Sequence, residues 1–71
     1  MKKEVYYIDP PKTCDVCSHA IGNVFYDCAT RLGGWANCCE PCFKKYGRGT
    51  GTGLGQQFKG QRDGRFLKTK E

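Results

Sequence analysis

Alternating hydrophobic and polar positions predict three short strands in the first half of the chain. The segment 4–9 is rich in aromatic and β-branched residues, and two consecutive prolines end it. The segments 23–29 and 34–38 are separated by a short loop that contains glycine, which indicates a hairpin. Alternation along the third segment places Trp35 on one face, and we expect its large ring to form part of the core. The alternative is that Trp35 lies on a recognition surface.

One short helix is predicted directly after the third strand. Pro41 suits the first helical turn, and Gly47 suits a helix C-terminus. Phe43 and Tyr46 lie three residues apart, so their side chains share a face of this helix. A hairpin followed by a short helix predicts a small α+β domain.

Four cysteines in two closely spaced pairs carry the clearest chemical signal. Each pair has the spacing C-x2-C, and 21 residues separate the two pairs. Such pairs form tight turns whose sulfur atoms converge, and four thiolates are the ligands that tetrahedral Zn²⁺ prefers. We therefore predict one Zn²⁺ ion, bound by Cys14, Cys17, Cys39 and Cys42. A first pair in a turn, a hairpin, and a second pair on a helix is the order of a treble-clef zinc finger. In a zinc ribbon, the second pair would lie on another hairpin.

The other cysteines and the single histidine leave alternatives open. Six cysteines also allow three disulfides, and iron bound as in rubredoxin is a variant of the same geometry. We see no secretion signal and expect a cytoplasmic protein, where cysteine clusters bind metal more often than they form disulfides. His19 is interpreted as a surface residue of the first turn. Cys28 and Cys38 are interpreted as small buried residues, although Cys38 with Cys42 is an alternative ligand spacing.

The chain is short, and this limits both its core and its chemistry. A single core in a chain of 71 residues contributes about 3–5 kcal/mol, whereas structural zinc contributes an apparent ~10–16 kcal/mol. We therefore expect the metal-free chain to be largely unfolded.

A closed site of four thiolates has no open position for water or a small-molecule substrate, so we predict that the protein is not an enzyme. No apolar run approaches the roughly 18 residues of a membrane span.

Positive charge is concentrated in the last part of the chain. The formal charge is +5, to which residues 1–42 contribute −1 and residues 43–71 contribute +6. Four bound thiolates and one Zn²⁺ would lower the total to +3. We divide the chain into a lead-in strand over 1–12, a zinc-binding module over 13–47 and a glycine-rich basic tail over 48–71.

Glycine punctuates the basic tail. Every second residue from Gly47 to Gly55 is glycine, which is typical either of a flexible linker or of an extended segment with one bare face. Asp63 and Gly64 then predict the turn of a second hairpin. Because an isolated hairpin is only marginally stable, we expect this one to dock on the zinc-binding module or on a partner.

Basic and aromatic residues are interleaved in the tail, a combination typical of nucleic-acid-binding surfaces. The candidates are Arg48, Phe58, Lys59, Arg62, Arg65, Phe66 and Lys68. We therefore predict a zinc-stabilised, non-catalytic binding module that contacts nucleic acid through its tail. The alternative is a module that docks on a host protein or a transcription complex, for example by adding a strand to a sheet edge.

From Thr13 onward the chain carries a characteristic series of motifs: Cys14-x2-Cys17, Phe25-Tyr26-Asp27, Gly34-Trp35-Ala36-Asn37, Cys39-x2-Cys42, Tyr46-Gly47, Gly55-Gln56 and Asp63-Gly64-Arg65-x-Leu67-Lys68. This series resembles a group of small zinc-finger proteins encoded by bacteriophages, of about the same length. The Gly-Trp-Ala-Asn stretch and the glycine repeat are its more specific parts. The group lacks cysteines at positions 28 and 38, which agrees with their interpretation as non-ligands. The resemblance implies a cytoplasmic phage protein that acts in an infected bacterium, and it implies no particular activity.

Overall fold

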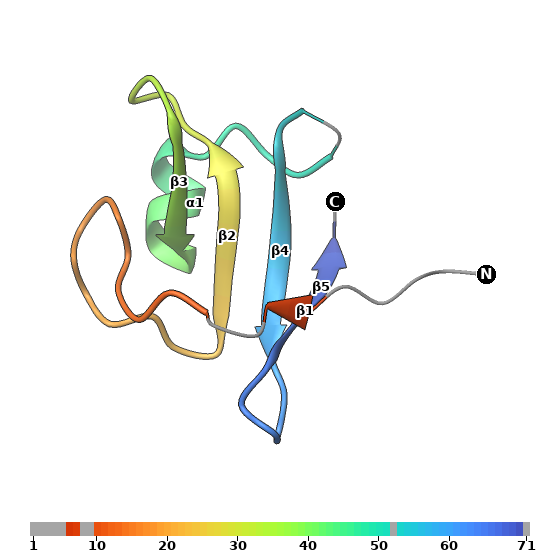
Figure 1. The fold of residues 1–71 in the computed structure, drawn as a ribbon. Helices are drawn as coiled ribbons and strands as arrows, with labels where there is room; N and C mark the ends of the chain where they lie inside the picture. Colours follow the sequence, from red (N-terminus) through yellow and green to blue (C-terminus); the bar gives the residue numbers. More distant parts are fainter. Residues whose placement is uncertain (1–5, 8–9, 52, 71) are drawn as a thin grey trace.

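The computed structural model describes residues 6–7, 10–51 and 53–70, with no account of the side chains at 6, 7 and 70. Within these described residues, five strands form one antiparallel sheet in the order β1-β5-β4-β2-β3, and one short helix packs against it (Figure 1). The elements are β1 (Tyr6–Tyr7), β2 (Val24–Ala29), β3 (Trp35–Cys39), α1 (Glu40–Tyr46), β4 (Gly55–Gly60) and β5 (Phe66–Lys70). The strand predicted over 4–9 includes β1, and its other residues lie outside the described part of the chain.

The hairpin of β2 and β3 and the helix that follows confirm the sequence prediction. The strands pair antiparallel with Asp27 opposite Asn37. The helix α1 begins directly after Cys39, with a proline in its first turn. It ends at Gly47, whose φ of −68° is not the left-handed conformation that usually selects glycine there. Glycine is needed at this position for space instead, because a Cβ atom would lie 2.5 Å from the ring of Phe43.

The second hairpin forms as predicted and docks on the first. β4 and β5 pair antiparallel around a turn in which Gly64 adopts a φ of +89°. β4 also pairs antiparallel with β2 over most of its length, with Phe58 opposite Phe25. The basic hairpin and the hairpin that leads to α1 are therefore parts of one sheet.

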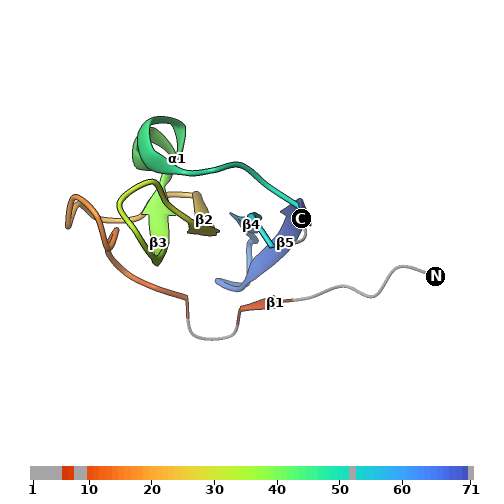
Figure 2. The same ribbon diagram turned by 90° about the horizontal axis from the view of Figure 1, so that it is seen from above.

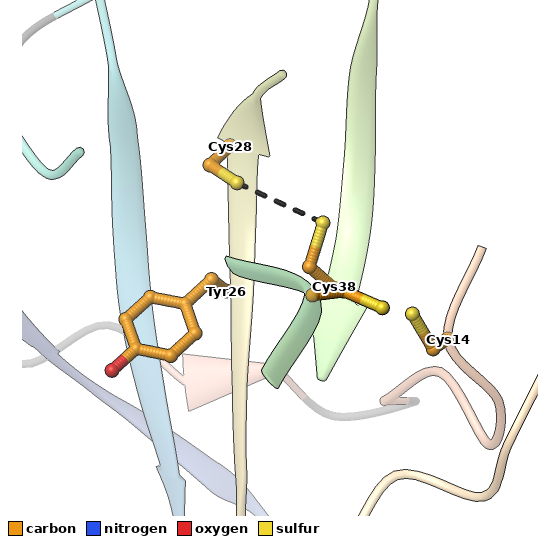
Figure 3. Packing of buried hydrophobic residues seen from close by; sticks show 5 residues of the cluster. Cys14, Tyr26, Cys28 and Cys38 are labelled. Carbon is orange, nitrogen blue, oxygen red and sulfur yellow. Dashed lines mark hydrogen bonds between the residues drawn. The ribbon is translucent and has the colours of Figure 1, made fainter. Parts of the chain in front are cut away.

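The two faces of β2 contribute to two separate clusters of buried side chains. On the face that α1 covers, the ring of Tyr26 stacks on Phe43 with 3.7 Å between ring centroids. Cys28 and Cys38 are fully buried on the same face (Figure 3). On the opposite face, Phe25 stacks on Phe58 at 5.1 Å between ring centroids. Figure 2 shows α1 on one side of the sheet, next to β2 and β3.

The glycine-rich segment folds into a hydrogen-bonded turn. Its described glycines at positions 49, 51 and 53 have φ values of +122°, +131° and +79°. The backbones of Gly51 and Gly55 exchange hydrogen bonds of 2.9 and 3.1 Å. A Cβ atom on Gly55 would lie 2.5 Å from the Cβ atom of Cys28, so glycine is required for the close approach of β4 to β2. The described part of this segment is thus neither a flat extended strand nor an unstructured linker.

The prediction that Trp35 belongs to the core is wrong. Its side chain is 56% exposed. Trp35 lies at the start of β3, the edge strand of the sheet. Its neighbour across the hairpin is Ala29. Because side chains alternate along a strand and Cys38 faces α1, Trp35 faces the opposite side, where the buried Phe25 and Phe58 lie nearer the other end of β2.

Candidate metal centre

Four cysteine sulfur atoms converge beside the N-terminus of α1. The Sγ atoms of Cys14, Cys17, Cys39 and Cys42 all lie within 4.8 Å of one another. A tetrahedral zinc site with Zn–S bonds of about 2.3 Å requires sulfur atoms about 3.8 Å apart. The Sγ atoms of Cys17 and Cys39, one from each pair, are separated by 3.7 Å. The four residues form a site for one Zn²⁺ ion, as the spacing predicts.

The first cysteine pair lies in a tight turn closed by backbone hydrogen bonds. The N–H of Cys14 donates to the carbonyl oxygen of His19, and the N–H of Ser18 donates to that of Cys14, both at 2.9 Å. Within the turn, the N–H of Val16 points at Sγ of Cys14 from 3.3 Å. Ser18 closes the turn with a φ of +65°, a left-handed conformation that a residue with a side chain adopts only at a cost.

A pair of hydrogen bonds attaches this turn to the strand that leads to the second cysteine pair. The N–H of Asp15 donates to the carbonyl oxygen of Asn37 at 2.9 Å. The N–H of Asn37 donates to Oδ2 of Asp15, also at 2.9 Å. Since Asp15 lies between two of the ligands and Asn37 lies two residues before a third, these bonds fix the distance between the two halves of the site. Sequence reasoning did not single out Asp15, because nothing local indicates which strand its turn meets.

The second cysteine pair lies at the junction of β3 and α1. Cys39 is the last residue of β3 and also the N-cap of α1, and Cys42 lies in the first helical turn. Alternation along β3 points Cys38 to the opposite face, toward Cys28. The structure therefore selects Cys39 over Cys38 as the partner of Cys42.

Electrostatics within the site favour a bound cation. At Cys14, burial raises the pKa, but the backbone N–H groups of Cys17, Cys39 and Val16 outweigh it and lower the pKa from 9.0 to about 6. Burial raises the pKa of Cys42, and the neighbouring thiols raise it further. Burial also raises the pKa of Cys39, although hydrogen bonds from the backbone and thiol of Cys42 oppose this rise. Four thiolates this close repel one another strongly, so a divalent cation is needed before all of them ionise.

The remaining predicted non-ligands lie outside the cluster. His19 is exposed and is not among the four converging residues. Cys28 and Cys38 are both completely buried, with their Sγ atoms 3.9 Å apart (Figure 3). Burial is the main reason that the pKa of Cys28 is raised and that the pKa of Cys38 is raised to about 12. Both side chains pack as small hydrophobic residues.

The structure separates the residues predicted to bind nucleic acid into accessible and inaccessible groups. Phe58 is only 2% exposed, so its ring is not accessible to a nucleic-acid base in this structure. Phe66 is half-buried, and its ring meets Phe25 edge-on at 5.2 Å. The basic side chains are accessible to different degrees: Arg48, Lys59, Arg62 and Arg65 are exposed, and Lys68 is half-buried. The guanidinium of Arg65 forms an ion pair with Asp63 at 2.7 Å.

Comparison with known proteins found no match: no family model matches the chain, and neither a curated protein nor a solved structure shows a significant match. Within the described part of the chain, α1 is the only helix, and no helix has the length and apolar character needed to cross a membrane.

Proposed function

We propose that the protein is a zinc-stabilised, non-catalytic binding module with a treble-clef-like arrangement. The support is the position of the four ligands, two in a turn and two at the start of a helix, with a hairpin between them. A zinc ion with four cysteine ligands has no position left for a substrate or a reactive water, so its role is to hold the fold. None of the six cysteines is in a disulfide, as expected for a protein that acts in a reducing cytoplasm.

The proposed ligand of this module is nucleic acid, contacted by the hairpin of β4 and β5. The observation that carries this proposal is the attachment of that hairpin to β2, which gives its charges fixed positions on the zinc-held sheet. Lys59 on β4 and Arg62 in the turn are exposed, and Lys68 on β5 is half-buried. Because Phe58 is buried, its ring cannot stack on a base, and the basic side chains of the hairpin contact the phosphate backbone of the nucleic acid instead.

Salt dependence of binding tests this proposal. The zinc-loaded protein is titrated into a fluorescein-labelled duplex and a labelled single strand at several salt concentrations, and anisotropy is recorded. We expect affinity to fall linearly on a log–log plot, with a slope of about −0.9 for each duplex phosphate neutralised and about −0.7 for each single-strand phosphate.

Paired variants locate the contact. Lys59→Gln and Arg62→Gln should weaken binding and reduce the salt slope. Lys44→Gln, which removes an exposed charge on α1, serves as the control and should have a smaller effect. Absence of binding at low salt would exclude a nucleic-acid role, and equal effects of all three variants would exclude the hairpin as the contact.

A further inference from the structure

The large hydrophobic side chains that the described residues expose gather at one end of the sheet. These are Leu32, Trp35 and Leu54, which are 61%, 56% and 39% exposed. Trp35 lies opposite Ala29, whose N–H donates to the carbonyl oxygen of Leu54 at 2.8 Å. Leu54 and Trp35 therefore flank Ala29 on its two sides. Leu32 lies in the loop between β2 and β3, at the upper end of the sheet in Figure 1.

Two exposed arginines lie in neighbouring segments and are anchored there through their backbones. The N–H of Arg31 donates to the carbonyl oxygen of Tyr46 at 2.7 Å, and the N–H of Arg48 donates to that of Ala29 at 3.0 Å. Neither the loop over 30–34 nor the segment over 47–54 contains an acidic residue. We call Arg31, Leu32, Trp35, Arg48 and Leu54 the tip surface, and its charged members are both positive.

An open hollow lies beside Trp35 in this surface. Leu32, Trp35, Val16 and Ala36 contribute to its walls, and its volume is about 330 Å³. Asp15 also lines the hollow, but one oxygen of its carboxylate accepts the hydrogen bond from Asn37. An exposed aromatic ring beside an open hollow has the features of a site for an unpaired base.

We propose that the tip surface binds single-stranded nucleic acid, with an unpaired base stacked on the indole ring of Trp35. This inference rests on the proposed nucleic-acid function and specifies the strand state that the protein prefers. Stacking requires an accessible aromatic face, and Trp35 offers one that the buried Phe58 does not. In a duplex the bases are stacked on one another, so Trp35 distinguishes unpaired from paired nucleotides.

The tip surface and the basic hairpin are arranged so that one strand can contact both. The tip surface lies at the end of the sheet where β4 begins, and the turn between β4 and β5 lies at the opposite end (Figure 1). A nucleic-acid strand that runs along the face of Trp35 therefore meets the tip surface at one end and, toward the other, Arg62 in the turn and Lys68, which pairs with Phe58 and so lies on the same face. The hairpin supplies charge, and Trp35 supplies preference for unpaired bases.

The chain contains one tryptophan, so its fluorescence reports on this site alone. The zinc-loaded protein is titrated with oligothymidylate and, separately, with a duplex of the same length at low salt. We expect oligothymidylate to quench the emission of Trp35, because stacking on a base quenches indole, and the duplex to quench it much less. In anisotropy measurements, Trp35→Ala should weaken binding of oligothymidylate by about 5- to 150-fold, which corresponds to the roughly 1–3 kcal/mol of one stacked base.

Two further variants separate stacking from loss of apolar area or of fold. Trp35→Phe keeps a ring that can stack and should recover most of the affinity for oligothymidylate. Leu54→Ala removes exposed apolar surface of the tip surface but no ring, so it should weaken binding of oligothymidylate much less than Trp35→Ala does. In every variant, binding of one zinc ion per chain shows that the fold is intact.

Several outcomes would overturn the inference. If oligothymidylate binds but the emission of Trp35 and the affinity of Trp35→Ala do not change, the tip surface is not the site, while the proposed function stands. Equal quenching by duplex and single strand would remove the strand preference. If neither nucleic acid binds, the inference and the proposed function both fail. A blue shift with phosphatidylglycerol vesicles, without quenching by oligothymidylate, would assign the surface to an anionic membrane instead.

Discussion

The two sides of β2 hold their neighbours by different means. On the side of α1, four of the five residues that form the buried cluster are cysteines: Cys14, Cys28, Cys38 and Cys42, together with Tyr26. On the other side, Phe25 contacts the rings of Phe58 and Phe66. We call these the metal side and the aromatic side.

The contrast shows that two different interactions stabilise the fold of this chain of 71 residues. Cysteine side chains bury little apolar surface, so a cluster rich in them is weak without a cross-link. A bound zinc ion supplies that cross-link on the metal side and links residues more than 20 positions apart. The cluster of Phe25, Phe58 and Phe66 contains no metal ligand, and there large rings supply the buried area instead. Each side can be tested separately.

Loss of the metal should have the largest effect. Removing zinc with a strong chelator, or replacing Cys42 by Ser, should unfold α1 and the strands beside it, because structural zinc contributes an apparent ~10–16 kcal/mol. Circular dichroism and metal analysis measure the change. Cys28→Ala is the matched control, since it removes a buried thiol that is not a ligand, and it should retain one zinc ion per chain. A Cys42→Ser chain that keeps both its zinc and its spectrum would contradict the assignment of the site.

Removing the ring of Phe58, at the centre of the aromatic side, should have the second largest effect on stability. Phe58→Ala should lower the free energy of unfolding by about 3–5 kcal/mol, the usual cost of truncating a fully buried phenylalanine. Phe66→Ala should cost less, because Phe66 is only half-buried. Because the ligands lie on the other side, we expect Phe58→Ala to bind zinc while the amides of β4 and β5 exchange faster by hydrogen exchange. Equal loss of protection in α1 would show that the two sides unfold as one unit.

Crowding between β2 and β4 should have the third largest effect on stability. A Cβ atom on Gly55 would lie 2.5 Å from Cβ of Cys28 and 2.8 Å from the carbonyl oxygen of Gly49. Gly55→Ala should therefore separate β4 from β2 and destabilise the protein by about 1–3 kcal/mol, as overpacking does. Gly22→Ala is the control, because a Cβ atom there meets nothing within 4 Å. Urea denaturation of both variants measures the difference in stability. Similar midpoints for the two variants would contradict the close approach of β4 to β2.

The smallest effect is expected in the first cysteine turn. Ser18 has a φ of +65°, which costs a residue with a side chain roughly 1–2 kcal/mol. Glycine avoids this cost but loses more backbone entropy on folding, about 0.5–1 kcal/mol. Ser18→Gly should therefore stabilise the zinc-loaded protein slightly, and thermal unfolding at a fixed zinc concentration measures the shift. A clear decrease in stability would mean that the serine side chain contributes more than its backbone conformation costs.

The elements and the ligands were predictable because their signals are local. The C-x2-C spacing, the proline and glycine that flank α1, and the Asp63-Gly64 turn each depend on a few neighbouring residues. Zinc ligation joins two such local signals without any knowledge of the chain between them.

The burial of individual aromatic residues was not predictable in the same way. Phe58 is buried because β4 pairs with β2 rather than standing apart in a tail, and Trp35 is exposed because β3 is an edge strand. Both facts depend on the order of strands in the sheet. The pairing of β1 with β5 likewise joins opposite ends of the chain, and no pattern within either segment specifies its partner.

The two hydrogen bonds between Asp15 and Asn37 have a consequence beyond the geometry of the ligands. β3 is an outer strand of the sheet, and without Asp15 the backbone groups of Asn37 would be unpaired. Unpaired outer strands are templates for aggregation with other chains. Because the zinc ion holds the turn that carries Asp15, depletion of zinc should expose this strand and make the protein prone to self-aggregation.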